Sequence, residues 1–118
     1  MNDLDTLTQM QLRFRDARNW KQFHSLRNLI VSLNLEAAEL LELTQWKDDA
    51  ALASALQDAQ FREMLRDECA DVLLYLVLVA EAGGVDLMEA ARAKIAKNAL
   101  KYPVEKAYGS ARKGEAGT

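Results

Sequence analysis

The chain has 118 residues, half of them apolar, and carries 18 acidic against 15 basic residues for a net charge of −3. This length is enough for one compact domain with a real core, and the mildly negative charge argues against a surface that binds duplex nucleic acid through general electrostatics. The longest apolar run, residues 72–80, is too short to span a bilayer. Because the single Cys69 cannot form an internal disulfide and no secretory leader opens the chain, we expect a soluble cytoplasmic protein without a nucleic-acid or membrane partner.

Helix-forming residues dominate the composition. The chain contains one proline and five glycines, and Ala, Leu, Glu, Lys, Gln and Arg are abundant. Strand-type alternation is absent, so the sequence predicts an all-α fold. We expect an antiparallel bundle of four to five helices over residues 1–103, followed by a polar C-terminal tail over residues 104–118.

The N-terminal half is expected to form two helices. Asp3 or Asp5 can cap a first helix that runs to about residue 18. After a connection, Ser25 can cap a long second helix that ends near residue 46.

The C-terminal half is expected to contain two further long helices. Residues 50–59 have weak apolar periodicity and predict a short helix or a loose excursion. A long helix over residues 61–82 then ends at the glycine pair 83–84, which favours a left-handed C-cap. Asp86 can cap a last helix, which stops before Pro103 because proline disfavours helical geometry in the preceding residue.

Two acidic pairs lie inside the most apolar stretches of the chain. They are Glu36 with Glu39 and Glu68 with Asp71, and residues three apart share one helix face. If the two long helices pack antiparallel, four carboxylates converge, and burying them uncompensated would cost several kcal/mol each. Either their pKa values rise or a cation is bound.

An all-oxygen cluster of this kind suits a hard ion, Mg²⁺ or Mn²⁺. A di-iron bundle would add Glu-x-x-His pairs, and the only histidine, His24, is not at that spacing. The alternative is that the acids face solvent or pair with arginines. The candidate arginines are Arg27, Arg62 and Arg66. Cys69 is too soft for Mg²⁺ and is expected to be a small core residue.

Further candidate binding residues follow the acidic pairs. Tyr75 lies four residues beyond Asp71 and shares its helix face, although a lone tyrosine is more often a core residue. Lys94, Asn98 and Lys101 form one cationic, amide-bearing stripe. Such a stripe suits a polyphosphate, and its alternative is a solvated basic face.

The aromatic residues fall near the two ends of the second predicted helix. Trp20, Phe23 and Trp46 can stack on a nucleotide base, or each tryptophan can cover one end of the core. His24 can bond a base edge, or it can cap the helix that begins near Ser25.

These residues together resemble the MazG-like all-α nucleoside triphosphate pyrophosphatases, and in particular their dCTP pyrophosphatase branch. The resemblance extends over residues 12–103. Its motifs are Trp20-Lys21-Gln22-Phe23-His24, Arg27-Asn28-Leu29, Glu36-x-x-Glu39-Leu40, Gln45-Trp46-Lys47, Glu68-x-x-Asp71-Val72-Leu73-x-Tyr75-Leu76 and Lys94-x-x-x-Asn98-x-x-Lys101-Tyr102-Pro103.

The resemblance implies Mg²⁺-dependent hydrolysis of dCTP or a related, modified deoxynucleoside triphosphate to the monophosphate and pyrophosphate, in nucleotide-pool sanitation. It implies a homodimer or homotetramer whose site borrows residues from a second subunit. It assigns Mg²⁺ binding to four acids, base binding to two tryptophans and a histidine, and sugar or phosphate contacts to four further residues. These are Glu36, Glu39, Glu68 and Asp71 for the metal, Trp20, His24 and Trp46 for the base, and Tyr75, Lys94, Asn98 and Lys101 for sugar and phosphates. Of the acids, Glu39 and Glu36 are the candidate catalytic residues.

Three positions depart from the family pattern. Gln11 stands where the animal relatives have a substrate-contacting histidine, which leaves base preference open between dCTP, dUTP and damaged nucleotides. Ala38 replaces a frequent glycine, and Lys101 replaces a common arginine, which exchanges a bidentate phosphate contact for a point charge. The alternative from another functional class is a non-catalytic metal-binding helical bundle or a module that binds a partner through its tail.

Overall fold

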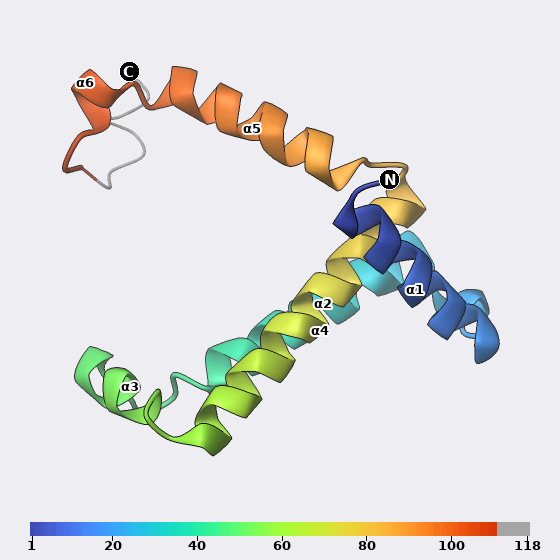
Figure 1. Cartoon of the computed structure of the whole chain (residues 1–118), viewed down its shortest axis with the longest axis horizontal. Helices are drawn as coiled ribbons and strands as arrows, with labels where there is room; N and C mark the ends of the chain where they lie inside the picture. The colour runs from blue at the N-terminus through green and yellow to red at the C-terminus, as the bar shows by residue number, and fades with distance from the viewer. Residues whose placement is uncertain (111–118) are drawn as a thin grey trace. The chain divides into compact units, whose positions relative to one another are not determined.

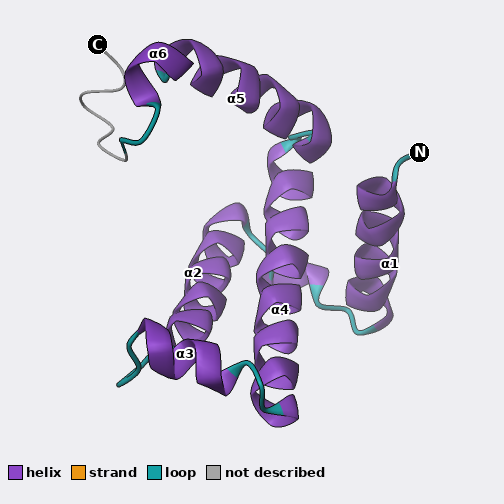
Figure 2. Cartoon of the chain, turned by 60° about the vertical axis from the view of Figure 1, so that its left-hand side comes forward, coloured by secondary structure: helices purple, strands orange, loops and turns teal. Residues whose placement is uncertain are grey.

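The computed structural model describes residues 1–110, and in that range helices joined by loops are present and strands are absent (Figure 2). The all-α prediction is therefore confirmed. The chain divides into two compact units, Met1–Gly84 and Val85–Thr118, called here the N-terminal and C-terminal units. A single domain over residues 1–103 stays a prediction. The helices are α1 (Asp3–Ala17), α2 (Leu26–Glu42), α3 (Asp49–Ala55), α4 (Ala59–Gly83), α5 (Leu87–Lys101) and α6 (Val104–Ala107), with a 3₁₀ turn η1 at Lys21–Phe23.

Helix α1 begins with a reciprocal capping box. The Asn2 side chain accepts a hydrogen bond from the Asp5 backbone N–H at 2.8 Å, and the Asp5 carboxylate accepts one from the Asn2 N–H at 3.1 Å. Two of the free N–H groups at the helix start are satisfied in this way. The prediction that Asp3 or Asp5 is the N-cap is wrong, because Asp5 is the third-position partner of an Asn2 cap.

Helix α2 begins as predicted and ends earlier than predicted. The Ser25 hydroxyl accepts from the Asn28 N–H at 3.1 Å, which confirms Ser25 as the N-cap. The helix ends at Glu42, not near residue 46. The chain then turns, and Trp46 adopts a left-handed backbone with φ of 65°.

Helices α3 and α4 are both capped by aspartates. Asp48 accepts from the Ala51 N–H at 2.8 Å and starts α3, which is shorter than the predicted 50–59 segment. Asp58 caps α4, so this helix begins at Ala59, two residues before the predicted start. Its end confirms the left-handed C-cap, because Gly84 has φ of 68°.

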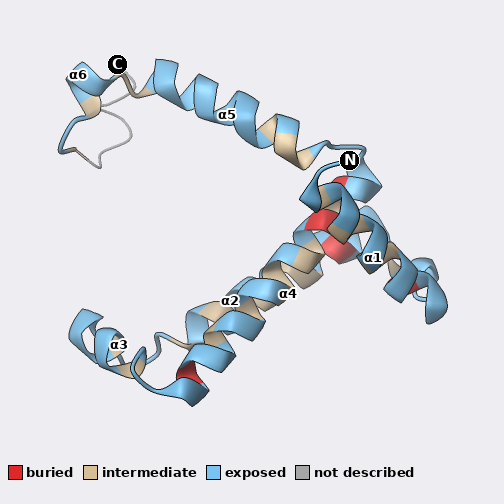
Figure 3. Cartoon of the chain, in the orientation of Figure 1, coloured by how far each residue is buried: buried red, intermediate tan, exposed pale blue. Residues whose placement is uncertain are grey.

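Helices α2 and α4 run antiparallel, side by side, and α1 packs against α4 (Figures 1 and 2). The buried positions gather where these three helices meet, with one more near the start of α4 (Figure 3). Each fully buried aliphatic side chain contributes about 1.5–3 kcal/mol. The buried apolar residues of the described range are Leu29, Phe61, Val77, Leu78 and Ala80. This small core fixes the register between α2 and α4.

The C-terminal unit consists of two helices in its described part. Asp86 accepts from the Glu89 N–H at 3.1 Å, which confirms the predicted cap of α5, and α5 ends before Pro103 as predicted. Residues 91–101 are all exposed. The predicted extended tail instead begins with the short helix α6, and its remainder, residues 111–118, lies outside the described residues.

Within residues 1–110, no helix combines the length and apolar character that a bilayer span requires.

Candidate functional site

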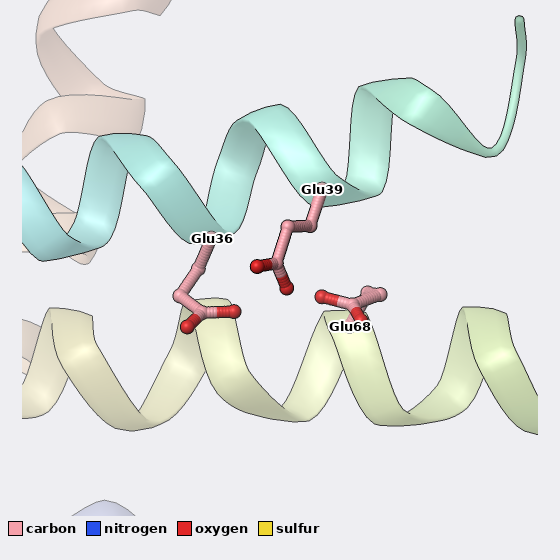
Figure 4. A group of neighbouring side chains, drawn as sticks. All are labelled: Glu36, Glu39 and Glu68. Atoms are coloured by element: carbon pink, nitrogen blue, oxygen red, sulfur yellow. The ribbon is translucent and has the colours of Figure 1, made fainter.

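Three carboxylates meet between α2 and α4. Glu36 and Glu39 lie one turn apart on α2, and Glu68 lies on the facing side of α4 (Figure 4). One oxygen from each lies within 4.8 Å of the others. The antiparallel packing therefore brings three of the four predicted acids into one group, which we call the acidic cluster.

The fourth acid, Asp71, lies one turn beyond Glu68 on α4 and is half-buried. It is not one of the three residues of the acidic cluster. Its charge nevertheless acts on both Glu36 and Glu68, and it shares a cavity wall with Glu36. Asp71 thus links the cluster to the neighbouring cavity.

The acidic cluster is electrostatically uncompensated. Burial raises the pKa of Glu36, and the Glu39, Asp71 and Glu68 carboxylates raise it further. Burial likewise raises the pKa of Glu68, with Glu39 as the next cause. One oxygen of Glu36 and one of Glu68 are buried without a hydrogen-bond partner. Such atoms are costly unless another group satisfies them.

The predicted arginine partners do not neutralise these acids. Arg15, which is none of the predicted partners, forms ion pairs with Asp16 and with Glu81. Arg62 instead donates to the Leu56 carbonyl at 2.8 Å. The alternative in which arginines pair with the acidic pairs therefore has no support in residues 1–110.

The donor set of the acidic cluster fits a divalent cation. All donors are carboxylate oxygens, which Mg²⁺ and Mn²⁺ prefer, and two buried oxygens lack any other partner. The acidic cluster can therefore hold such an ion.

A cavity of about 330 Å³ adjoins this cluster, and we call it the α1 cavity. Four predicted substrate-binding residues line it together with two of the predicted metal ligands. The four are Gln11, Trp20, His24 and Tyr75, and the two are Glu36 and Asp71. The structure thus joins residues from α1, the α1–α2 connection, α2 and α4 at one opening.

His24 lies in the wall of the α1 cavity and is half-buried. Its Nδ1 atom is buried without a partner. Burial lowers the pKa of His24, and the nearby positive charge of Arg15 lowers it further. Both causes favour the neutral imidazole. It does not cap α2, because Ser25 does.

Trp20 is held by the end of α1. Its ring meets that of Phe14 edge to face, with 5.7 Å between centroids, and its backbone N–H donates to the Arg15 carbonyl at 3.1 Å. The Arg18 guanidinium covers the Phe14 ring at 3.6 Å. Trp20 remains 44% exposed, so it does not simply cover the core, and the Arg18 guanidinium lies 6.0 Å from its ring centroid.

The other predicted binding residues lie outside the α1 cavity. Trp46 follows the far end of α2 and is 94% exposed, so it covers no core. Lys94, Asn98 and Lys101 are exposed on α5 in the C-terminal unit, and Lys101 places its Nζ 5.4 Å from the Tyr102 ring centroid.

Some residues of the site were not predicted. Arg15 and Phe14 line the α1 cavity, and Arg15 lies four residues after Gln11, so helical spacing was the available signal. Glu42 and Asp67 border a second polar cavity beside Glu39 and Glu68. The prediction that Cys69 is a core residue is wrong, because its position on α4 is exposed.

Comparison with known proteins agrees with this arrangement. A sequence model of the MazG-like family matches residues 31–115. The chain belongs to the MazG-like family. The family resemblance predicted from the acidic pairs and their neighbours is thereby confirmed.

Relatives of this MazG-like chain carry related names. It is 40% identical over 108 residues to dCTP pyrophosphatase 1 of Rattus norvegicus, covering 92% of this chain and 64% of that protein. It is 38% identical over 110 residues to dCTP pyrophosphatase 1 of Homo sapiens, covering 93% and 65%. The chain thus spans just under two thirds of these curated relatives. A pyrophosphatase crystal structure from Archaeoglobus fulgidus DSM 4304 superposes with a TM-score of 0.80 at 34% identity, over 87% of this chain and 94% of that one.

Proposed function

We propose that this protein is a Mg²⁺-dependent nucleoside triphosphate pyrophosphohydrolase that converts dCTP, or a related modified deoxynucleoside triphosphate, to the monophosphate and pyrophosphate. The observation that carries the proposal is the meeting of the acidic cluster with a cavity lined by an aromatic ring, an imidazole and a phenol. The dCTP pyrophosphatase relatives from rat and human support the choice of substrate. The biological role that follows is nucleotide-pool sanitation.

The four acids would hold the cation in this proposal. They are Glu36, Glu39, Glu68 and Asp71. When bound, Mg²⁺ or Mn²⁺ offsets the charge of the triphosphate and makes a water molecule easier to deprotonate. The raised pKa values of Glu36 and Glu68 are consistent with ligands whose mutual repulsion a cation would relieve.

Hydrolysis requires one proton acceptor close to the phosphates. Water forms a new bond to phosphorus, the anhydride bond between the α- and β-phosphates breaks, and the proton of the water moves to a carboxylate. Glu39 is our first candidate for this acceptor because it is the exposed member of the acidic cluster, and Glu36 is the second.

The α1 cavity would receive the base and sugar. Trp20, a partly exposed ring in the cavity wall, would stack on the base. His24 and Gln11 offer polar atoms to the base edge, and Tyr75 lies beside Asp71 on the same wall, where it would contact sugar or phosphate. The exposed Lys94, Asn98 and Lys101 of α5 would bind the phosphates.

We further propose that two or four copies of the chain assemble to complete the site. Trp20 and Trp46 flank opposite ends of α2, whose 17 residues span about 25 Å. One base cannot stack on both within a single chain, so Trp46 would serve a second copy. Exposed apolar residues on α2 and α5 support such assembly. Examples are Leu35 at 62%, Leu41 at 68%, Ile95 at 69% and Leu100 at 85% exposure.

The exposed, free Cys69 also suits a reducing compartment, which supports our proposal of a cytoplasmic protein. No feature of the described residues calls for a nucleic-acid or membrane partner in this proposal.

The deciding experiment is incubation of the protein with each of the common nucleoside triphosphates and Mg²⁺, with separate detection of pyrophosphate and inorganic phosphate. We expect pyrophosphate release, fastest with a deoxynucleotide, and none after chelation with EDTA. Release of inorganic phosphate alone would indicate another reaction. No release from any nucleotide would leave the non-catalytic metal-binding or partner-binding module as the function.

A further inference from the structure

Arg15 is the one buried charged residue within residues 1–110, with 8% of its surface exposed. It projects from the last turn of α1 and forms part of the wall of the α1 cavity. Neither the acidic cluster nor the proposed phosphate-binding stripe uses it. A buried guanidinium at the mouth of a nucleotide-sized cavity therefore needs its own explanation.

The contacts of Arg15 leave most of its donors free. Its Nε donates to Asp16 Oδ1 at 2.8 Å, and its Nη1 lies 3.8 Å from Glu81 Oε2, which is too long for a hydrogen bond. A guanidinium carries five N–H donors. The terminal nitrogens are not among the buried atoms without a partner, so they are not sealed from solvent, and Arg15 lines the α1 cavity.

Two carboxylates hold this guanidinium in place. Asp16 comes from the same helix, and Glu81 reaches it from α4. Burying an unpaired charge would be costly, and the two acids offset that cost. Because both acids contact the guanidinium itself, its terminal nitrogens are restrained before any ligand binds.

The helical register aims Arg15 at the same ligand as Gln11 and Trp20. Gln11 and Arg15 are one turn apart on α1 and therefore share a face, and both line the α1 cavity. The backbone N–H of Trp20 donates to the Arg15 carbonyl, which ties the backbone that carries the stacking ring to the backbone that carries the guanidinium. A base stacked on Trp20 would present its edge to the donors of Arg15.

The fork of an arginine pairs best with two adjacent acceptors, as in its bidentate contact with N7 and O6 of guanine. Cytosine also offers two adjacent acceptors, O2 and N3. In uracil and thymine an N3–H donor separates the two carbonyl oxygens. In adenine the acceptors N1 and N7 each have the amino group, a donor, as their neighbour. A fixed guanidinium fork thus distinguishes cytosine and guanine from the other bases.

We infer that Arg15 is a specificity-determining residue whose terminal guanidinium nitrogens donate to two adjacent acceptors on the nucleotide base. This inference rests on the proposed function and adds to it the group that reads the base. Asp16 and Glu81 are positioning residues, because they hold the guanidinium and do not touch the base.

The test compares Arg15→Met with Glu81→Gln in the full-length protein. Arg15→Met keeps the length of the side chain and removes every donor, whereas Glu81→Gln breaks the ion pair to α4 and keeps the guanidinium. For each variant, kcat and KM are measured with dCTP, dGTP, dUTP, dTTP and dATP. Thermal unfolding and circular dichroism establish that each variant is folded.

We expect Arg15→Met to lower kcat/KM for the preferred substrate by tenfold or more, mostly through KM, since each charge-assisted hydrogen bond is worth about a factor of ten. The values for dUTP, dTTP and dATP should change by less than about threefold, so the preference collapses. Loss with dCTP alone, dGTP alone or both identifies which acceptor pair is read. Glu81→Gln should weaken the preference only in part, because Asp16 still holds Nε, and Arg15→Lys should retain only part of it.

Three results would overturn the inference. They are a wild-type enzyme that prefers neither dCTP nor dGTP over dUTP, an Arg15→Met variant that keeps the preference, and a Glu81→Gln variant that loses it equally. Calorimetric binding of dCMP, dGMP and dUMP separates this inference from the proposed function. If Arg15 sets the binding preference among these monophosphates but the protein releases no pyrophosphate, the inference stands and the catalytic proposal is rejected.

Discussion

The α2–α4 pair and helix α5 carry opposite charge in opposite surroundings. Between α2 and α4, carboxylates from two helices lie within 4.8 Å of one another, and two of their oxygens are buried without a partner. On α5, Lys94, Asn98 and Lys101 are exposed. One region concentrates negative charge at a cost, and the other displays cationic and amide groups at little cost.

The difference shows which part of the proposed site one chain builds alone. The packing of α2 on α4 already assembles the acidic cluster, so a cation would find its ligands in place. An exposed lysine stripe is not preorganised to the same degree, because long side chains retain rotamer freedom until a ligand orders them. Loss of a cluster acid should therefore affect turnover more than loss of a stripe residue.

The largest expected effect comes from Glu39→Ala. We expect kcat/KM to fall at least about 100-fold, since this change removes both a cation ligand and the proposed proton acceptor. The measurement is pyrophosphate release at saturating Mg²⁺. Glu63→Ala, an exposed acid on the same helical pair, is the matched control and should keep wild-type activity. Near-normal turnover by Glu39→Ala would contradict the assignment.

A smaller effect is expected from Lys94→Ala. Removing one exposed ammonium should raise KM about tenfold with a lesser change in kcat, because a charge-assisted contact to phosphate is lost. Steady-state kinetics at two ionic strengths measure it. Arg92→Ala removes a charge from the opposite face of the same exposed helix, so equal effects of the two variants would show that α5 acts only through its overall charge.

Divalent cations should stabilise the α2–α4 pair and leave a cluster variant unaffected. At a free Mn²⁺ or Mg²⁺ concentration about five times Kd, linkage predicts a gain near 1 kcal/mol in the free energy of unfolding, or a rise in Tm of several degrees. Differential scanning fluorimetry with the ion and with EDTA measures this rise. Glu68→Gln should abolish this rise, and a wild-type Tm that neither ion changes would count against the cation site.

The smallest expected effect is on the pH dependence of stability without metal. The pKa of Glu36 is raised above 4.5 in the folded protein, so the folded state binds this proton more tightly than the unfolded state. Its contribution to stability is therefore full below pH 4.5 and is lost as pH rises through the raised folded pKa. The free energy of unfolding, measured with urea in EDTA across this window, should fall less steeply with pH for Glu36→Gln than for the wild type. An equally steep fall would refute Glu36 as the cause.

The sequence correctly predicted those helix ends that depend on a single residue. Ser25, Asp86 and Gly84 act as expected because a cap needs only its own side chain or backbone freedom. The end of α2 was misjudged because the residues before Trp46 contain no helix breaker, so the turn depends on context.

The same distinction, between local spacing and tertiary context, holds for the residues of the site. Spacing of three on two helices sufficed to predict that Glu36, Glu39 and Glu68 meet, because only helix pairing was needed in addition. The burial of Arg15 could not be read from α1, since it depends on α4 bringing Glu81 and the cavity wall to it. Neighbouring arginines look alike in sequence, yet Arg13 on α1 and Arg18 at its C-cap are exposed in the structure.

The backbone of Trp46 has a consequence for engineering this protein. Its φ of 65° is a conformation that glycine adopts freely and a bulky residue adopts at a cost of roughly 1 kcal/mol or more. A glycine there should raise the Tm of an isolated chain, while the indole that faces solvent would be gone. Under the proposed function this ring serves a second copy of the chain, so the same glycine should lower activity while it raises stability.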